Sequence, residues 1–110
     1  MREIISINGD NLTAEENELL YGISEKSLEK MQKKLHNVTG MNIKVKTYHQ
    51  EGKNKKFSIR SSLNLGSRKF EANAEDWKIA KALKESLKGL SNEVEHSFHL
   101  SNRSHVTKSR

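Results

Sequence analysis

A ten-residue alternation of apolar and polar side chains is the feature that most limits what this chain can fold into. It covers residues 56–65, where one face would hold Phe57, Ile59, Ser61, Leu63 and Leu65 and the other Lys56, Ser58, Arg60, Ser62 and Asn64. Because a strand points successive side chains to opposite faces, this period of two predicts a β-strand with one apolar face. Residues 43–48 alternate in the same way and predict a second strand, with Lys44, Lys46 and Tyr48 on its polar face.

Two further strands are predicted on either side of this pair. The β-branched residues of segment 3–8 lead into the turn-favouring cluster 8–11 and predict the first strand. Gly66-Ser67 favours a tight hairpin turn that leads into a short fourth strand over residues 69–72, and the charged segment 51–55 is a predicted turn. Residues 42–73 are thus expected to form an antiparallel meander.

Helical patterns flank this meander. Thr13 and Glu16 have the spacing of a capping box, so we expect a helix to begin there. Its apolar positions recur at helical spacing and are Leu19, Leu20, Ile23, Leu28, Met31 and Leu35. From Asn73 the period changes to 3.6, which predicts a long final helix with the apolar stripe Trp77, Ala80, Leu83, Leu87, Leu90, Val94 and Phe98.

Trp77 opens the apolar stripe of the predicted final helix. Because such a stripe is typical of a core, we expect Trp77 to anchor the core and not to stack on a nucleobase. Glu75 and Asp76 fall in the expected first turn of this helix, where acids interact favourably with the positive end of the helix dipole.

The predicted order β-α-β-β-β-α indicates an α+β fold, with a four-stranded, mainly antiparallel sheet and two helices packed on one face. The other sheet face would be open to solvent and would carry Lys44, Lys46, Tyr48, Lys56, Arg60, Lys69 and Glu71. A chain of 110 residues has room for one such domain, which we place at residues 1–98. Residues 99–110 are polar and basic and are expected to form a flexible tail.

Positive charge is concentrated in the middle of the chain. The formal net charge is +6, and residues 30–69 contain eleven lysines and arginines against the single acid Glu51. Such a block is typical of proteins that bind a phosphate-rich partner. The candidate RNA-binding residues form a ridge on each helix, Lys26, Lys30, Lys33 and Lys34 on the first and Lys78, Lys81, Lys84 and Lys88 on the last. If the helices pack side by side, these ridges would line a groove that suits a phosphate backbone.

The sequence offers little for catalysis or for a cofactor. It has no cysteine and no G-x-S-x-G, phosphate-loop or H-E-x-x-H motif, so we expect neither an enzyme, a small-molecule substrate nor a cofactor. His96, His99 and His105 form the closest group of histidines, but no cysteine accompanies them and we expect no metal site. No apolar run approaches the roughly 20 residues of a spanning helix. We therefore expect a cytoplasmic protein that does not insert into a membrane.

Three segments resemble the short ribosome hibernation-promoting factors, or ribosome-associated inhibitors, of the sigma-54 modulation protein family. They are Ile5-Ser6-Ile7-Asn8-Gly9-Asp10-Asn11-Leu12-Thr13, Lys30-Met31-Gln32-Lys33-Lys34-Leu35, and Phe70-Glu71-Ala72-Asn73-Ala74-Glu75-Asp76-Trp77-Lys78-Ile79-Ala80-Lys81-Ala82-Leu83. The last looks like the family's strand-to-helix signature. The resemblance covers about residues 2–98.

The resemblance implies a factor that binds rRNA of the small ribosomal subunit in the channel for messenger and transfer RNA, and so silences translation in stressed or idle cells. Family basic positions of the first helix carry over to Lys30 and Lys33, with Lys26 nearby. On the last helix the resemblance places them at Ser86, Gly89 and Glu93, none of which is basic. Lys81, Lys84 and Lys88 lie close enough in the sequence to replace them.

Other functions fit parts of the same pattern. Residues 78–83 also resemble the basic start of the last helix in double-stranded RNA-binding modules, which contact phosphates across the A-form groove. A protein adaptor that holds an acidic partner on its open sheet face is a third possibility. Salt-sensitive binding to ribosomes, to naked duplex RNA or to neither distinguishes these three classes.

Overall fold

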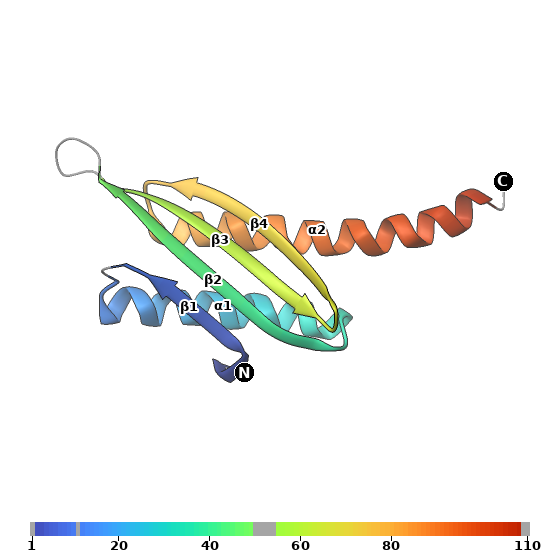
Figure 1. Ribbon diagram of the computed structural model, residues 1–110, viewed down its shortest axis with the longest axis horizontal. Coiled ribbons are helices and arrows are strands. Elements are labelled where there is room, and N and C mark those ends of the chain that lie inside the picture. Colours follow the sequence, from blue (N-terminus) through green and yellow to red (C-terminus); the bar gives the residue numbers. More distant parts are fainter. Residues whose placement is uncertain (1, 11, 50–54, 109–110) are drawn as a thin grey trace.

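The computed structural model describes residues 2–10, 12–49 and 55–108 (Figure 1). Its elements follow the predicted order, preceded by one short 3-10 helix. They are η1 (Arg2–Ile4), β1 (Ile5–Gly9), α1 (Ala14–Lys34), β2 (Val38–His49), β3 (Lys55–Leu65), β4 (Arg68–Asp76) and α2 (Ile79–Lys108). The predicted turn at 51–55 lies outside the described residues apart from Lys55.

The four strands form one mixed sheet in the order β1-β2-β3-β4. β2, β3 and β4 form the predicted antiparallel meander, whereas β1 pairs with β2 in parallel. The parallel pairing follows from the connection, because α1 carries the chain back across the sheet between β1 and β2. The predicted α+β class and mainly antiparallel sheet are therefore confirmed.

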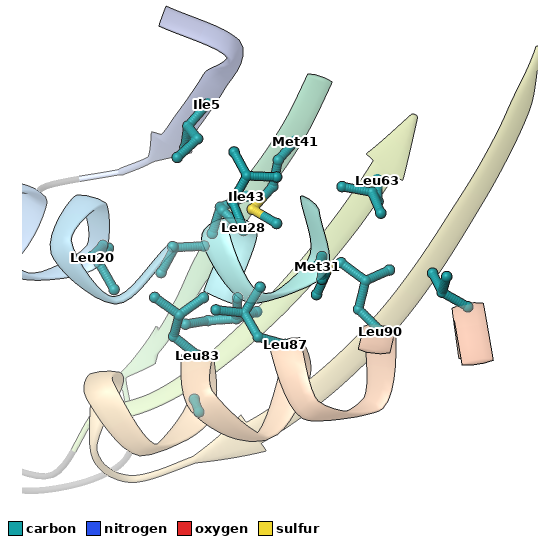
Figure 2. Close-up of a cluster of buried hydrophobic side chains, with 14 residues drawn as sticks. Ile5, Leu20, Leu28, Met31, Met41, Ile43, Leu63, Leu83, Leu87 and Leu90 are labelled. Atoms are coloured by element: carbon teal, nitrogen blue, oxygen red, sulfur yellow. The ribbon is translucent and has the colours of Figure 1, made fainter. Parts of the chain in front are cut away.

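Both helices cover the same face of the sheet (Figure 1). α2 packs against β3 and β4, and α1 packs against β1 and α2. The core lies between the sheet and the helices. It is formed by the apolar side chains of the alternating strand pattern and of the helical pattern. Figure 2 shows this cluster, whose fully buried members include Leu20, Leu28, Met41, Ile43, Ile59, Leu63, Leu83 and Leu90.

The capping box at the start of α1 is present. The Glu16 amide donates to Thr13 Oγ1 at 3.0 Å, and the Thr13 amide donates to Glu16 Oε1 at 3.0 Å. These bonds satisfy two amides that the first turn of a helix otherwise leaves without partners. The apolar residues predicted for this helix are buried or half-buried except Leu19, which has 46% of its surface exposed.

The boundary between the last strand and the last helix differs from the prediction. β4 continues to Asp76, and α2 begins only at Ile79. The reason is that β3 is long enough to keep pairing, with Ile59 opposite Ala74 and Phe57 opposite Asp76. Glu75 and Asp76 therefore precede α2 and do not occupy its first turn.

The prediction that Trp77 anchors the core is wrong. Trp77 lies between β4 and α2 with 53% of its surface exposed. It continues the alternation of Glu71, Asn73 and Glu75, which are all exposed, whereas Ala72 and Ala74 are half-buried against the helices. Trp77 thus follows the strand period of two and not the helical period of 3.6.

The final helix supplies the remaining core and extends further along the chain than the predicted domain. Leu83, Leu87, Leu90 and Val94 are buried as predicted, and the side chain of Phe98 lies outside the described part. The helical backbone continues to Lys108, so the division at residue 98 stays a prediction. Neither helix in the described ranges has the length and apolar character needed to cross a membrane.

Gly22 offers a direct test of packing along α1. A Cβ placed there would meet nothing within 4 Å. Gly22→Ala is therefore expected to raise the free energy of unfolding by about 0.5–1 kcal/mol, because alanine loses less backbone freedom in a helix than glycine. Urea unfolding measures the change, and a loss of stability would contradict the open space around Gly22. Gly66→Ala is the control of opposite sign: with φ at 59°, alanine should cost about 1–2 kcal/mol.

Candidate nucleic-acid interface

A groove of about 1240 Å³ runs between α1 and α2 on the outer surface of the helical layer. Its apolar side chains come from both helices and include Ile23, Met31, Leu87 and Val94. Leu87 and Val94 are buried and continue into the core. The groove is therefore a fixed feature of the helix pair, because the residues that form it also hold the two helices together.

Six of the eight lysines predicted to bind RNA line this groove. They are Lys26, Lys30, Lys33 and Lys34 of α1 and Lys84 and Lys88 of α2. All six side chains are exposed. Spacings of three and four residues place the members of each set on one helix face, and the contact between the helices brings the two faces together. The predicted side-by-side arrangement of the two ridges is thus present.

One acidic residue, Glu95 of α2, also lines the groove. Its Oε1 atom lies 3.2 Å from Lys34 Nζ, so this ion pair connects the two helices. The other five groove lysines make no ion pair with another residue in the described ranges. The sequence alone gives no sign of the role of Glu95, because an ion pair between two helices can be recognised only once their packing is known.

Lys78 and Lys81 do not line the groove. Lys78 precedes α2, and its amide donates to Asp76 Oδ1 at 3.0 Å. Lys81 Nζ lies 3.8 Å from Asp76 Oδ2. Asp76 therefore binds the backbone just before the start of α2 and partly neutralises the positive charge of Lys81.

Two of the three positions that the family resemblance indicated on α2 face the sheet. Ser86 is fully buried; its Oγ donates to the Ala72 carbonyl at 3.1 Å and lies 2.7 Å from Ser61 Oγ. A Cβ on Gly89 would lie 3.3 Å from Ala72 Cβ. Neither position presents a side chain to a partner in this chain. Glu93 is exposed.

The sheet face opposite the helices carries the polar residues predicted for it. Lys44, Lys46, Tyr48, Arg60, Lys69 and Glu71 are exposed, and Lys56 is half-buried. Lys44 lies directly opposite Arg60 in the β2–β3 register, and Arg60 Nε donates to Asn73 Oδ1 at 3.1 Å. Like charges placed opposite each other destabilise a sheet by a few tenths of a kcal/mol or more unless an anion lies between them.

The described side chains include no group of three metal-ligating residues. His96 is exposed on α2, while the side chains of His99 and His105, the other two histidines of the group considered for zinc, lie outside the described part.

Comparison with known proteins connects this arrangement to solved structures. No protein-family model matches the sequence, and no curated protein matches it. A ribosomal subunit interface protein from Coxiella burnetii is similar, with a TM-score of 0.57 and 15% identity over 84% of this chain and 96% of that chain. The N-terminal domain of Thermus thermophilus Protein Y gives a TM-score of 0.56 and 18% identity over 84% of this chain and 93% of that chain.

The chain shares the fold of these two proteins. Both likenesses extend over nearly the whole of the other chain. The α+β fold predicted from the sequence is therefore one that solved structures also contain.

Proposed function

We propose that this protein is a ribosome-associated factor that silences translation by binding rRNA of the small subunit in the channel for messenger and transfer RNA. The observation that carries the proposal is the groove between α1 and α2, in which six exposed lysines surround a fixed apolar floor. In this mechanism the protein blocks the channel by occupying it, and no bond is made or broken.

The groove has the properties that a sugar–phosphate backbone requires. Lysine ammonium groups bind phosphates as point charges, and their long aliphatic stems let them adjust to an irregular RNA surface. Lys33 and Lys34 also lie in the last turn of α1, where the helix dipole favours positive charge. Lysines bind phosphates whatever the base sequence, which suits the double-helical parts of rRNA, because duplex RNA is recognised mainly through its shape and backbone.

The named structures support a ribosomal partner. One of the two solved structures is called a ribosomal subunit interface protein, and the sequence independently resembles hibernation factors in three segments. Duplex RNA away from the ribosome is the alternative partner. This alternative rested on residues 78–83, which resemble the basic helix start of double-stranded RNA-binding modules. Lys78 and Lys81 of this segment lie outside the groove, beside Asp76.

Co-sedimentation through sucrose gradients tests the proposal, using ribosomes and separated subunits at low and moderate salt. We expect the protein to travel with the small subunit, and its affinity to fall about a thousandfold between 50 and 200 mM salt if six lysines each contact a phosphate. Failure to co-sediment at low salt, or indifference to salt, would contradict the proposal. Tight filter binding to naked duplex RNA without ribosomes would favour the alternative.

Neutralising the acid in the groove should strengthen binding. Glu95→Gln removes the negative charge nearest to Lys34 and releases that lysine for a phosphate, so we expect affinity for the small subunit to rise about three- to tenfold at low salt. Glu85→Gln makes the same charge change on an exposed position of α2 that does not line the groove. Equal gains for both variants would show that net charge, and not the groove, determines affinity.

A further inference from the structure

The open face of the sheet holds a second group of residues with the chemistry of a nucleic-acid surface. Tyr48 and Trp77 are two of the three large apolar side chains exposed among the described residues, and both lie at the same end of the sheet. The proposed function uses the helical layer, so it assigns no role to this face. Lys56 lies next to both residues, paired with Tyr48 in the strand register and with its Nζ 5.7 Å from the centroid of the Trp77 ring.

Strand register places Tyr48, Lys56 and Trp77 in one row. Tyr48 is paired with Lys56 in β2–β3, and the β3–β4 pairing ends with Phe57 opposite Asp76, which puts Trp77 beside Lys56. Lys56 Nζ lies 5.7 Å from the centroid of the Trp77 ring and 3.4 Å from Glu75 Oε1. The two rings are thus about two strand spacings apart, roughly 10 Å, with an ammonium group between them.

The neighbouring rows of the same face carry further positive charge. Lys46 lies opposite Ser58, and Lys44 lies opposite Arg60. Ser58 lies between Lys46 and Glu75 in the strand register, and its small side chain leaves room above the sheet at this point. This surface therefore combines two exposed aromatic rings with Lys44, Lys46 and Arg60, none of which forms an ion pair with another described residue.

We propose that this open face binds a single-stranded nucleic acid, with bases stacked on Tyr48 and Trp77 and phosphates held by Lys44, Lys46 and Arg60. Aromatic platforms beside a basic track are how proteins bind single strands without sequence preference. An anion between Lys44 and Arg60 also removes the repulsion that their direct pairing creates. A duplex keeps its bases stacked inside, so the rings select a single strand.

Charge complementarity alone would also admit an acidic protein segment. The exposed rings decide for nucleic acid, because every base offers a flat π-face to Tyr48 and Trp77, whereas aspartate and glutamate side chains offer none. The strand binds on the face opposite the helices, so it does not compete with a backbone held in the α1–α2 groove (Figure 1).

Trp77 is the only tryptophan in the chain, so its fluorescence reports on this face alone. We would titrate the whole protein with ten-nucleotide oligo(U) at 0.15 M salt. The matching DNA strand, a ten-base-pair duplex RNA and a polyglutamate peptide would be the comparison ligands. The RNA strand is expected to quench Trp77 saturably, whereas duplex RNA and polyglutamate should not. If the DNA strand binds with the same affinity as the RNA strand, the face binds single strands in general. If the DNA strand binds more weakly, the face prefers RNA.

Variants separate stacking from charge. Tyr48→Ala should weaken binding about tenfold, and Tyr48→Phe, which keeps the ring, should leave it unchanged. Lys44→Ala with Arg60→Ala should lower the slope of log affinity against log salt by about 1.4, which is two phosphate contacts. The groove variant Lys30→Glu/Lys33→Glu should bind the strand within twofold of the unmodified protein.

Three results would overturn the proposal. They are absence of quenching at low salt, equal affinity of Tyr48→Ala and the unmodified protein, and quenching by polyglutamate as strong as by RNA. Thermal unfolding of Tyr48→Ala checks that the fold is retained, which we expect because this side chain is 45% exposed. Because the oligonucleotide test uses no ribosomes, its result is independent of the co-sedimentation result.

Discussion

Lys30→Glu/Lys33→Glu is expected to weaken association with the small ribosomal subunit roughly a hundredfold. Both lysines line the α1–α2 groove and are exposed. Each charge-assisted contact to a phosphate is worth about tenfold in affinity, and the new carboxylates add repulsion. Sedimentation with separated subunits at 0.1 M salt measures the loss.

A matched control shows whether position or net charge is responsible. Lys55→Glu/Lys69→Glu makes the same change in charge at two exposed strand positions that do not line the groove. We expect this control to lose at most a few-fold, because screening shortens the reach of a surface charge to about 10 Å at this salt concentration. Equal losses for the two double variants would contradict a specific role of the groove.

Leu28→Ala is expected to lower the free energy of unfolding by about 2–5 kcal/mol. Leu28 is fully buried on the inner face of α1 and belongs to the core cluster drawn in Figure 2. Its truncation removes buried apolar surface and leaves a cavity between α1 and the sheet that its neighbours fill only in part. A domain of this size is stable by about 5–15 kcal/mol, so the loss is a large share of the total.

Leu19→Ala on the same helix is the control for Leu28→Ala. Its side chain is 46% exposed, so we expect a change of at most about 0.5 kcal/mol. Urea unfolding of both variants measures the difference. Equal losses would mean that α1 does not face the sheet as described. Leu28→Ala also tests the site, because α1 carries four of the groove lysines.

The sheet was predictable because its sequence pattern has one interpretation. Over residues 56–65 no helical period fits the alternation, and the observed burial of Ile59 and Leu63 follows it. The end of β4 was not predictable in the same way. Ala72-Asn73-Ala74 fits both a strand and the start of a helix, and the pairing with β3 decides in favour of the strand.

The error at Trp77 follows from that boundary. Its spacing to Ala80 fits a helix stripe, but β4 continues four residues beyond the predicted end at residue 72, and the Trp77 side chain that follows it is exposed. The polar odd-numbered positions Glu71, Asn73 and Glu75 were the available signal, because Trp77 continues them.

The candidate site was predictable helix by helix but not as a whole. Regular spacing placed four lysines on one face of α1, and the structure keeps them together. Which lysines of α2 join them depends on how the helix is rotated about its axis, and this is fixed by the packing of Ser86 and Gly89 against β4. That contact turns Lys84 and Lys88 into the groove and leaves Lys81 beside Asp76.

Directed hydroxyl-radical probing tests most directly whether the groove faces the rRNA of the mRNA and tRNA channel. The chain has no cysteine, so an iron chelate can be attached to a single new one at Ser27→Cys or Ser91→Cys, both in the groove lining, with Ser67→Cys in the β3–β4 turn as the control. We expect the two groove positions to cleave small-subunit rRNA around that channel, in a pattern different from that of the control. Cleavage confined to other regions of the ribosome, or the same pattern from all three positions, would contradict the account.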